Sequence, residues 1–213
     1  MRRTPSPAVA ARALGALSLL SLLAGGCGGG GGGGSGALLV DLPAAVDGVV
    51  DGTGFVETTG AMNLGDSSVN VGIHGYLRFD LSAVPAGATI LSATLITRQT
   101  ASGFFGTPYT DLGNLLVDHM DIGAALGSED FVGTTFTFAL AVLSTDPVLE
   151  TKTADVTAAV TADLAAARTT SDYRLRFAAD TNSDAGPDFV QFSTSEFDAG
   201  TGVTPTLEVT YLP

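Results

Sequence analysis

From residue 37 to the C-terminus, short runs of alternating apolar and polar residues are separated by clusters of Gly, Pro, Asp and Asn. Alternation with a period of two places successive side chains on opposite faces of a strand, and short strands between turn residues are typical of β-sandwiches and barrels. The pattern predicts one all-β domain over 37–213. The expected strands are Ala37–Asp41, Gly54–Thr58, Ser68–Ile73, Tyr76–Leu81, Thr89–Thr100, Leu115–Ile122, Thr134–Val142, Pro147–Thr153, Tyr173–Ala178, Phe189–Thr194 and Thr206–Tyr211.

The same alternation assigns faces to these strands. In three of them the apolar residues share one face: Leu77, Phe79 and Leu81; Leu91, Ala93 and Leu95; Tyr173, Leu175 and Phe177. The opposite faces, expected to point outward, carry Tyr76, Arg78, Asp80, Arg98, Arg174 and Arg176. One buried face per strand predicts two packed antiparallel sheets.

One segment, Asp155–Arg168, departs from the alternation. Its apolar residues fall at helical spacing, and its many alanines favour a helix. Asp155 is suited to cap the first turn. We expect one short helix that crosses an end or a side of the sandwich.

The N-terminal segment, residues 1–27, has the layout of a secretory signal: two arginines, an apolar stretch centred on Leu14–Leu23, then small residues. The apolar stretch is shorter than the roughly 20 residues that span a bilayer. The sequence Leu-Ala-Gly-Gly-Cys at 23–27 resembles a bacterial lipobox, in which Cys27 becomes the lipidated first residue after cleavage of 1–26. The alternative is an ordinary signal peptide with an incidental cysteine.

Residues 28–36 read GGGGGGGSG and are expected to form, together with Cys27, a flexible tether between the lipid and the domain. A phosphate-binding loop would need a strand before the glycines and a helix after them, so we reject that interpretation. Lipidation would anchor the domain to the bacterial cell envelope, at the outer membrane or the cell surface.

Charge and composition exclude several classes of protein. The formal net charge is −13, and all of the 22 acidic residues lie after the signal segment. Three of the nine basic residues lie in that segment, which leaves a body with a net charge of −16. Such a body repels phosphate backbones, so nucleic acid is not an expected partner. A single cysteine excludes an internal disulfide framework and a multi-cysteine zinc site.

Four segments together resemble the DNRLRE-type domains of bacterial secreted proteins. The most specific is GYLRFDLSAVPAGATILSATL at 75–95, with its Phe-Asp-Leu-Ser strand end, Pro-Ala-Gly turn and following strand. The others are GFVETTGAMNLGDSSVNVG at 54–72, ADVTAAVTADL at 154–164 and TPTLEVTY at 204–211. The resemblance implies a jelly-roll sandwich with an accessory role, and a related group binds the polysaccharide alginate. Residues 101–150 depart from the family pattern and contain no Trp, which puts an aromatic sugar platform in doubt.

The loop at 180–188 is a candidate calcium site. Asp180, Asn182, Asp184 and Asp188 supply oxygen side chains at alternate positions, and Ca²⁺ takes six to eight such ligands. The spacing differs from an EF-hand, because glycine stands at position 7 of the loop and no Glu stands at position 12. The alternative is a solvated hairpin loop rich in turn-forming residues.

Two sets of residues are candidates for ligand binding. Four arginines expected on outward faces, with Tyr76 beside them, suit the carboxylates of an acidic polysaccharide; they are Arg78, Arg98, Arg174 and Arg176. The alternative is cross-strand pairing with acidic neighbours. The loop 101–114 adds three aromatic side chains, which either bind a ligand or cap an open end of the core: Phe104, Phe105 and Tyr109.

Support for catalysis is thin. His74 and His119 are the only histidines, and neither a G-x-S-x-G nor an H-E-x-x-H motif occurs. We therefore expect a non-catalytic module that binds a surface or extracellular polysaccharide. The alternatives are a structural or adhesive protein that binds another protein, and a glycan hydrolase or lyase.

Overall fold

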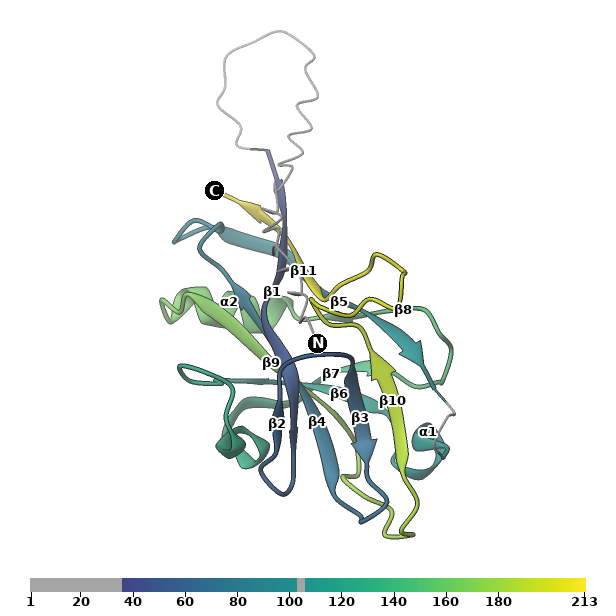
Figure 1. Ribbon diagram of the computed structural model, residues 1–213. Coiled ribbons are helices and arrows are strands. Elements are labelled where there is room, and N and C mark those ends of the chain that lie inside the picture. The colour runs from purple at the N-terminus through teal and green to yellow at the C-terminus, as the bar shows by residue number, and fades with distance from the viewer. Residues whose placement is uncertain (1–35, 103–105) are drawn as a thin grey trace, which may run out of the picture. The chain divides into compact units, whose positions relative to one another are not determined.

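The computed structural model describes residues 36–102 and 106–213, which contain eleven strands, two α-helices and one 3₁₀ helix (Figure 1). The strands are β1 (Leu38–Asp51), β2 (Val56–Glu57), β3 (Met62–Asp66), β4 (Gly72–Asp80), β5 (Thr89–Ala101), β6 (Leu115–Met120), β7 (Thr135–Ser144), β8 (Thr151–Asp155), β9 (Thr170–Phe177), β10 (Asp188–Phe192) and β11 (Thr206–Leu212). The helices are α1 (Pro108–Asp111), α2 (Thr157–Ala165) and the 3₁₀ helix η1 (Ser128–Val132).

The first sheet has the order β1–β11–β5–β8, with antiparallel pairing throughout. Only the first part of β1, Leu38–Pro43, belongs to it. The rest of β1 pairs with β4, after a bulge between Ala44 and Val46. A bulge bends a strand, and here it lets β1 pass from one sheet to the other.

The second sheet has the order β2–β1–β4–β9–β6–β7, and it is also antiparallel. Strands β3 and β10 connect the two sheets on the remaining side, because β3 pairs with β4 while β10 pairs with both β3 and the end of β5. The prediction of an all-β fold with packed antiparallel sheets is confirmed.

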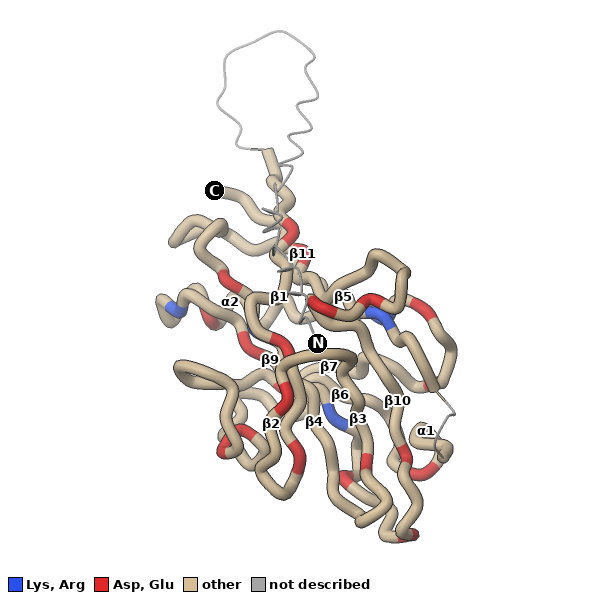
Figure 2. Tube along the Cα trace, in the orientation of Figure 1, with Lys and Arg blue, Asp and Glu red and all other residues tan. Residues whose placement is uncertain are grey.

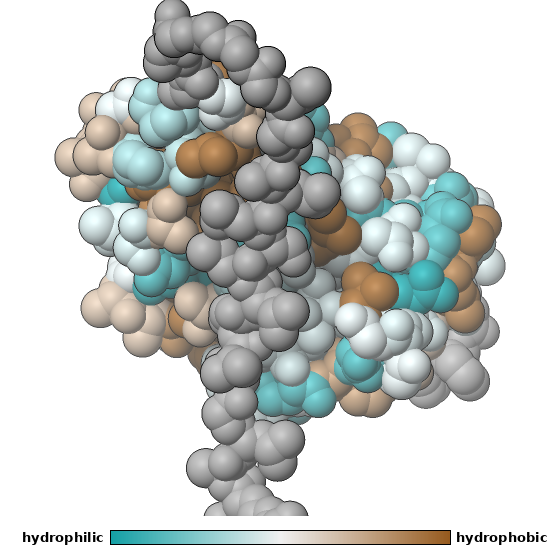
Figure 3. Space-filling view, turned by 90° about the horizontal axis from the view of Figure 1, so that it is seen from above, coloured by the Kyte–Doolittle hydropathy of each residue, from teal (hydrophilic) through white to brown (hydrophobic). Residues whose placement is uncertain are grey.

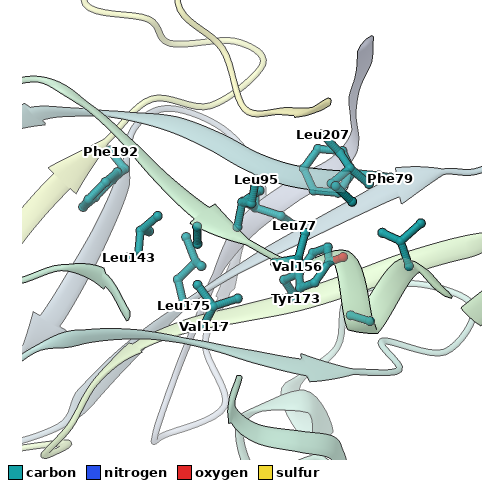
Figure 4. Packing of buried hydrophobic residues seen from close by; sticks show 14 of the residues in the cluster. Leu77, Phe79, Leu95, Val117, Leu143, Val156, Tyr173, Leu175, Phe192 and Leu207 are labelled. Atoms are coloured by element: carbon teal, nitrogen blue, oxygen red, sulfur yellow. The ribbon is translucent and has the colours of Figure 1, made fainter. Parts of the chain in front are cut away.

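The core fills the space between the sheets (Figure 4). Leu95 and Leu207 of the first sheet meet Leu77, Tyr173 and Leu175 of the second. The predicted inward face is confirmed in β4 and β9, but it is wrong for Leu91, which is 48% exposed. The register of β5 against β11 shifts beside Leu91, so its side chain leaves the core face and its neighbour Ile90 packs there instead.

The predicted helix is α2, which packs against β5 and β9 and buries Ala159 and Val160. Asp155 precedes it, and its carboxylate accepts the N–H of Thr157 in the first turn. A second, shorter helix, α1, lies in the segment predicted as a loop after β5. Within the described residues, no helix has the length and apolar character to cross a membrane.

The outer face of the second sheet carries a smaller apolar cluster under the segment 121–133, which includes η1. Val50 of β1, Tyr76 of β4, Met120 of β6 and Ile122 are buried there. All of β9 after its first residue is therefore buried, on both faces. Both faces of this strand are covered, which the alternation of its residues did not indicate.

Along the described chain, acidic residues far outnumber basic ones (Figure 2). On the face shown in Figure 3, hydrophobic residues lie in small groups among polar ones. Strand β7, at the edge of the second sheet, exposes three large apolar side chains: Phe136, Phe138 and Val142.

Candidate functional site

Two arginines of β9 share a single carboxylate on the outer face of the second sheet. Nε and Nη2 of Arg174 lie 3.0 and 2.8 Å from Asp118 Oδ2, and Nε of Arg176 lies 2.8 Å from the same oxygen. All three side chains are at least nine-tenths buried. The backbone oxygens of Phe131 and Phe177 accept one further hydrogen bond from each guanidinium.

The hydrogen bonds hold Asp118 in its charged form. Burial raises the pKa of this carboxyl, but hydrogen bonds from Arg176, from the backbone N–H of Ala139 and from Arg174 outweigh it, so the net shift is downward. The two guanidiniums therefore face one negative charge. A guanidinium carries five N–H donors. Arg176 uses three of them on Asp118 and the backbone oxygen of Phe177 and keeps two without a partner among the described residues, whereas Arg174 also interacts with the Tyr76 hydroxyl.

A bulge in the edge strand β7 completes this arrangement. Val117 pairs with Ala141 and His119 with Thr137, so three residues of β7 stand opposite Asp118 alone. Ala139 has a positive φ of 50° and gives its N–H to Asp118 Oδ1 at 2.7 Å. The neighbouring Phe138 lies against Arg176, with its ring centroid 3.8 Å from the guanidinium carbon.

His74 of β4 lies at the other side of these arginines. Its ring stacks on Phe131 at 4.2 Å, and Nε2 lies 2.9 Å from Asp180 Oδ1. Burial lowers the pKa of His74 more strongly than the hydrogen bond to Asp180 raises it, and Arg174 and Arg176 lower it further. The hydrogen bond with His74 lowers the pKa of Asp180, so at neutral pH the pair consists of a neutral imidazole and a carboxylate.

These residues surround a cavity of about 380 Å³, hereafter the arginine pocket. Its walls are His74, Phe131, Val132, Gly133, Phe138, Arg174, Arg176, Ala178 and Asp180. The volume is at the small end of the range for ligand pockets. At the arginine pocket, the positive charges of Arg174 and Arg176 are balanced by the negative charges of Asp118 and Asp180, whereas the body as a whole has a net charge of −16. Chemically, the pocket offers fixed N–H donors, one imidazole and one exposed aromatic ring.

The neutral state of His74 predicts how stability depends on pH. A histidine whose pKa is lowered by folding stabilises the native state fully above its ordinary pKa of about 6.5, and that contribution is lost as the pH falls toward the lower folded value. Between pH 7.5 and 5.5, we expect the free energy of unfolding to fall by up to about 1.4 kcal/mol more in the wild type than in His74→Gln. Urea unfolding at the two pH values measures this difference. Equal losses in both proteins would contradict the assignment.

The expectation that the arginine face is open to solvent is wrong for most of its members. Arg174, Arg176 and Tyr76 are buried, and Tyr76 donates its hydroxyl hydrogen to the backbone oxygen of Asp130. Arg78 binds Asp172 through two nitrogens at 2.8 and 2.6 Å. The physical reason is that the segment 121–133 lies over this face of the sheet. Arg78 donates to the backbone oxygen of Gly123, and Asp172 accepts the N–H of Ile122, so both side chains bind this segment.

Arg98 lies on a different sheet and does not join the other arginines. It is in β5, and its Nη2 donates to the backbone oxygen of Leu149 at 3.2 Å. Among the aromatic residues, Phe104 and Phe105 lie outside the described residues. Tyr109 is half-buried in α1, where its hydroxyl donates to Gln99 Oε1 at 2.6 Å and its ring meets Phe177 edge-on. For Tyr109, this favours the capping of the core over ligand binding.

The four predicted calcium ligands of the loop 180–188 take part in different hydrogen bonds. Asp180 belongs to the arginine pocket, and Asp184 Oδ1 accepts the N–H of Gly186. Asn182 donates to Asp188 Oδ2 at 2.8 Å, and Asp188 Oδ1 accepts the N–H of Thr107. In the part of the chain that the structure describes, no three His, Cys, Asp or Glu side chains are grouped as metal ligands. The calcium site stays a prediction.

Four side chains that build this site were not among the candidate binding residues: His74, Phe131 and Phe138 line the arginine pocket, and Asp118 holds its two arginines. Asp118 carried a usable signal, because it lies on the same face of its expected strand as the polar residues of β9. Phe138 could not be assigned by alternation, because the bulge at Ala139 breaks the period of two.

Comparison with known proteins gives no family. No protein-family model matches the chain. No curated protein is significantly similar to it. The functional argument therefore rests on the residues of the pocket.

Proposed function

We propose that the protein is a lipid-anchored binding module of the bacterial cell envelope, built as a DNRLRE-type jelly roll, and that its arginine pocket binds a surface or extracellular polysaccharide. The observation that carries the proposal is the pair of guanidiniums held on Asp118 at the wall of a concave pocket. The unused N–H groups of Arg176 point to hydroxyl or carboxylate oxygens as ligands, because arginine donors pair with oxygen acceptors in a fixed geometry.

An aromatic ring beside these donors supports a sugar as the ligand. Phe138 is 64% exposed, although Arg176 lies against its ring. An exposed aromatic ring offers an apolar surface to the C–H face of a sugar ring, while the guanidiniums bind its oxygens. Because the charges within the pocket balance, an acidic sugar is repelled less there than at other places on this negatively charged surface.

Binding of polyuronate tests this proposal. The full-length chain is titrated with alginate and with a neutral glucan, and we expect saturable binding of alginate. Phe138→Ala should weaken that binding about twofold to tenfold, since aromatic contacts contribute on the order of 0.5–1.5 kcal/mol.

The matched control is Phe55→Ala, because Phe55 is also exposed, at 58%, and does not line the pocket. Its affinity should equal that of the wild type. The polysaccharide proposal fails if alginate does not bind, or if both variants weaken binding equally.

The anchor is a separate part of the proposal, and it concerns a residue outside the described ones. Radiolabelled palmitate should enter the wild-type protein and be absent from Cys27→Ala, because Cys27 is the only cysteine of the chain. Equal labelling of both proteins would contradict lipidation at this residue.

A second candidate function is binding to another protein through β7. This strand lies at the edge of the second sheet, and it exposes Phe136, Phe138 and Val142 without a charged residue among them. Edge strands of this kind pair with strands of other chains. A glycan array separates this candidate from the first, and a reducing-end assay with polysaccharides tests the third candidate, a hydrolase or lyase.

A further inference from the structure

A second cavity lies between α2 and the strands β6 and β7. Its volume is about 310 Å³, and it is hereafter called the helix groove. Ala158, Ala159, Ala162 and Ala166 of the α2 segment line one side, and Phe136 and Leu140 of β7 line the other. Because alanine side chains are small, they leave this space open, and because most of the lining side chains are apolar, the groove is mostly apolar.

A buried histidine forms the polar part of the helix groove. His119 lines it and is only 3% exposed. Its Nε2 lies 3.0 Å from both carboxylate oxygens of Asp163, which is 1% exposed. Arg168 Nε lies 3.3 Å from the same carboxylate. A buried carboxylate at the edge of an apolar groove is costly unless hydrogen-bond donors are close to it, and here His119 and Arg168 provide them.

The hydrogen bond to Asp163 determines what His119 offers to a ligand. An ionised carboxylate only accepts hydrogen bonds, so Nε2 carries the hydrogen, and in the neutral ring Nδ1 is an acceptor. No described residue makes a hydrogen bond with Nδ1 of His119. The wall of the groove therefore includes a histidine whose Nδ1 makes no hydrogen bond with the described residues.

Aromatic contacts fix the ring of Phe136 beside this acceptor. The ring centroids of His119 and Phe136 are 5.0 Å apart, and the guanidinium carbon of Arg168 lies 4.3 Å from the centroid of the same phenyl ring. A flat apolar ligand would thus meet an aromatic wall and the alanine methyl groups of α2 at the same time.

We propose that the helix groove binds a small, largely apolar molecule that carries one hydroxyl group, of the phenol class. The hydroxyl donates to Nδ1 of His119, and the ring lies between Phe136 and the alanines of α2. This site is independent of the arginine pocket, because the two share no lining residue.

Binding of phenol and toluene to the full-length chain tests the proposal. The two probes are similar in size, and only phenol carries a hydroxyl group. We expect saturable binding of phenol, about fivefold tighter than that of toluene, since one hydrogen bond contributes about 1 kcal/mol. Long-range ¹H–¹⁵N spectra should show a shift of the His119 Nδ1 signal on addition of phenol.

Filling the groove provides the matched control. Ala162→Leu places a larger side chain in the groove while the residues His119 and Asp163 are kept, and it should weaken phenol binding tenfold or more. Ala165→Leu makes the same change on α2 at an exposed residue that does not line the groove, and it should bind phenol as the wild type does. The proposal is overturned if phenol does not bind, if toluene binds equally well, or if both leucine variants behave alike.

Discussion

Replacing Asp118 with Asn is expected to lower the free energy of unfolding by about 3–5 kcal/mol. Asp118 is the only carboxylate bonded to Arg174 and Arg176 in the described residues, and all three side chains are buried. The substitution leaves two guanidiniums without a counter-charge and turns amide hydrogens toward their N–H groups. Loss of one partner from a buried charge network is among the most destabilising of single changes. Urea unfolding at neutral pH measures the effect.

A surface carboxylate is the control for Asp118. Asp146 accepts a hydrogen bond from Lys152 at 2.8 Å, but its side chain is 46% exposed, so Asp146→Asn should change the stability little. A loss below about 1 kcal/mol in Asp118→Asn would contradict the buried network.

An apolar replacement of all three groups separates stability from function. The triple variant Asp118→Leu, Arg174→Met, Arg176→Leu should recover most of the stability lost in Asp118→Asn, because apolar side chains of similar size often replace buried ion pairs without loss. It should not bind alginate. If the triple variant is stable but does not bind alginate, the charged residues serve ligand binding rather than stability.

Much of the fold could be predicted from local patterns. The alternation in β4 and β9 identified the residues of the core, since a buried face imposes a period of two on any strand. The helical spacing after Asp155 identified α2, because a helix that is buried on one face carries apolar residues three and four positions apart. These features depend only on neighbours in the sequence.

The arginine pocket could not be predicted in the same way. Arg174 and Arg176 fall on the polar face of β9, as expected, but what covers that face is the distant segment 121–133 and a bulge in β7. No local pattern specifies which loop folds over which sheet. The alternation therefore predicts an exposed polar face on β9, whereas this face is buried and carries the charged network of Arg174, Arg176 and Asp118.

One strand was also misplaced by the sequence pattern. Ser68–Ile73 was predicted as a strand, but Ser67 and Val71 are joined by a backbone hydrogen bond across a tight turn, in which Asn70 has a positive φ of 58°. The strand before that turn, β3, was not predicted, because glycine within a strand is disfavoured and Gly65 interrupts its pattern.

Gly65→Ala is expected to lower the free energy of unfolding by about 2–5 kcal/mol. Gly65 has a φ of 142°, which L-residues rarely adopt. A Cβ atom at this position would overlap the carbonyl oxygen of Asp188 and lie 2.9 Å from Phe189 Cα. These are backbone atoms of the paired strand β10, so they can move only if the pairing of β3 with β10 is distorted. Thermal and urea unfolding measure the loss.

The comparison with Gly87→Ala isolates the steric part of this effect. Gly87 also has a positive φ, 89°, but a Cβ atom there would have no neighbour within 4 Å. Its substitution should therefore cost only the backbone strain, about 1–2 kcal/mol. A larger loss in Gly65→Ala than in Gly87→Ala requires that β10 lies directly against β3. The pairing of β3 with β10 connects the two sheets. The loop 180–188 ends where β10 starts, and Asp180 of this loop bonds His74 in the arginine pocket. Equal losses in the two variants would therefore mean that the loop and β10 are placed differently beside the pocket.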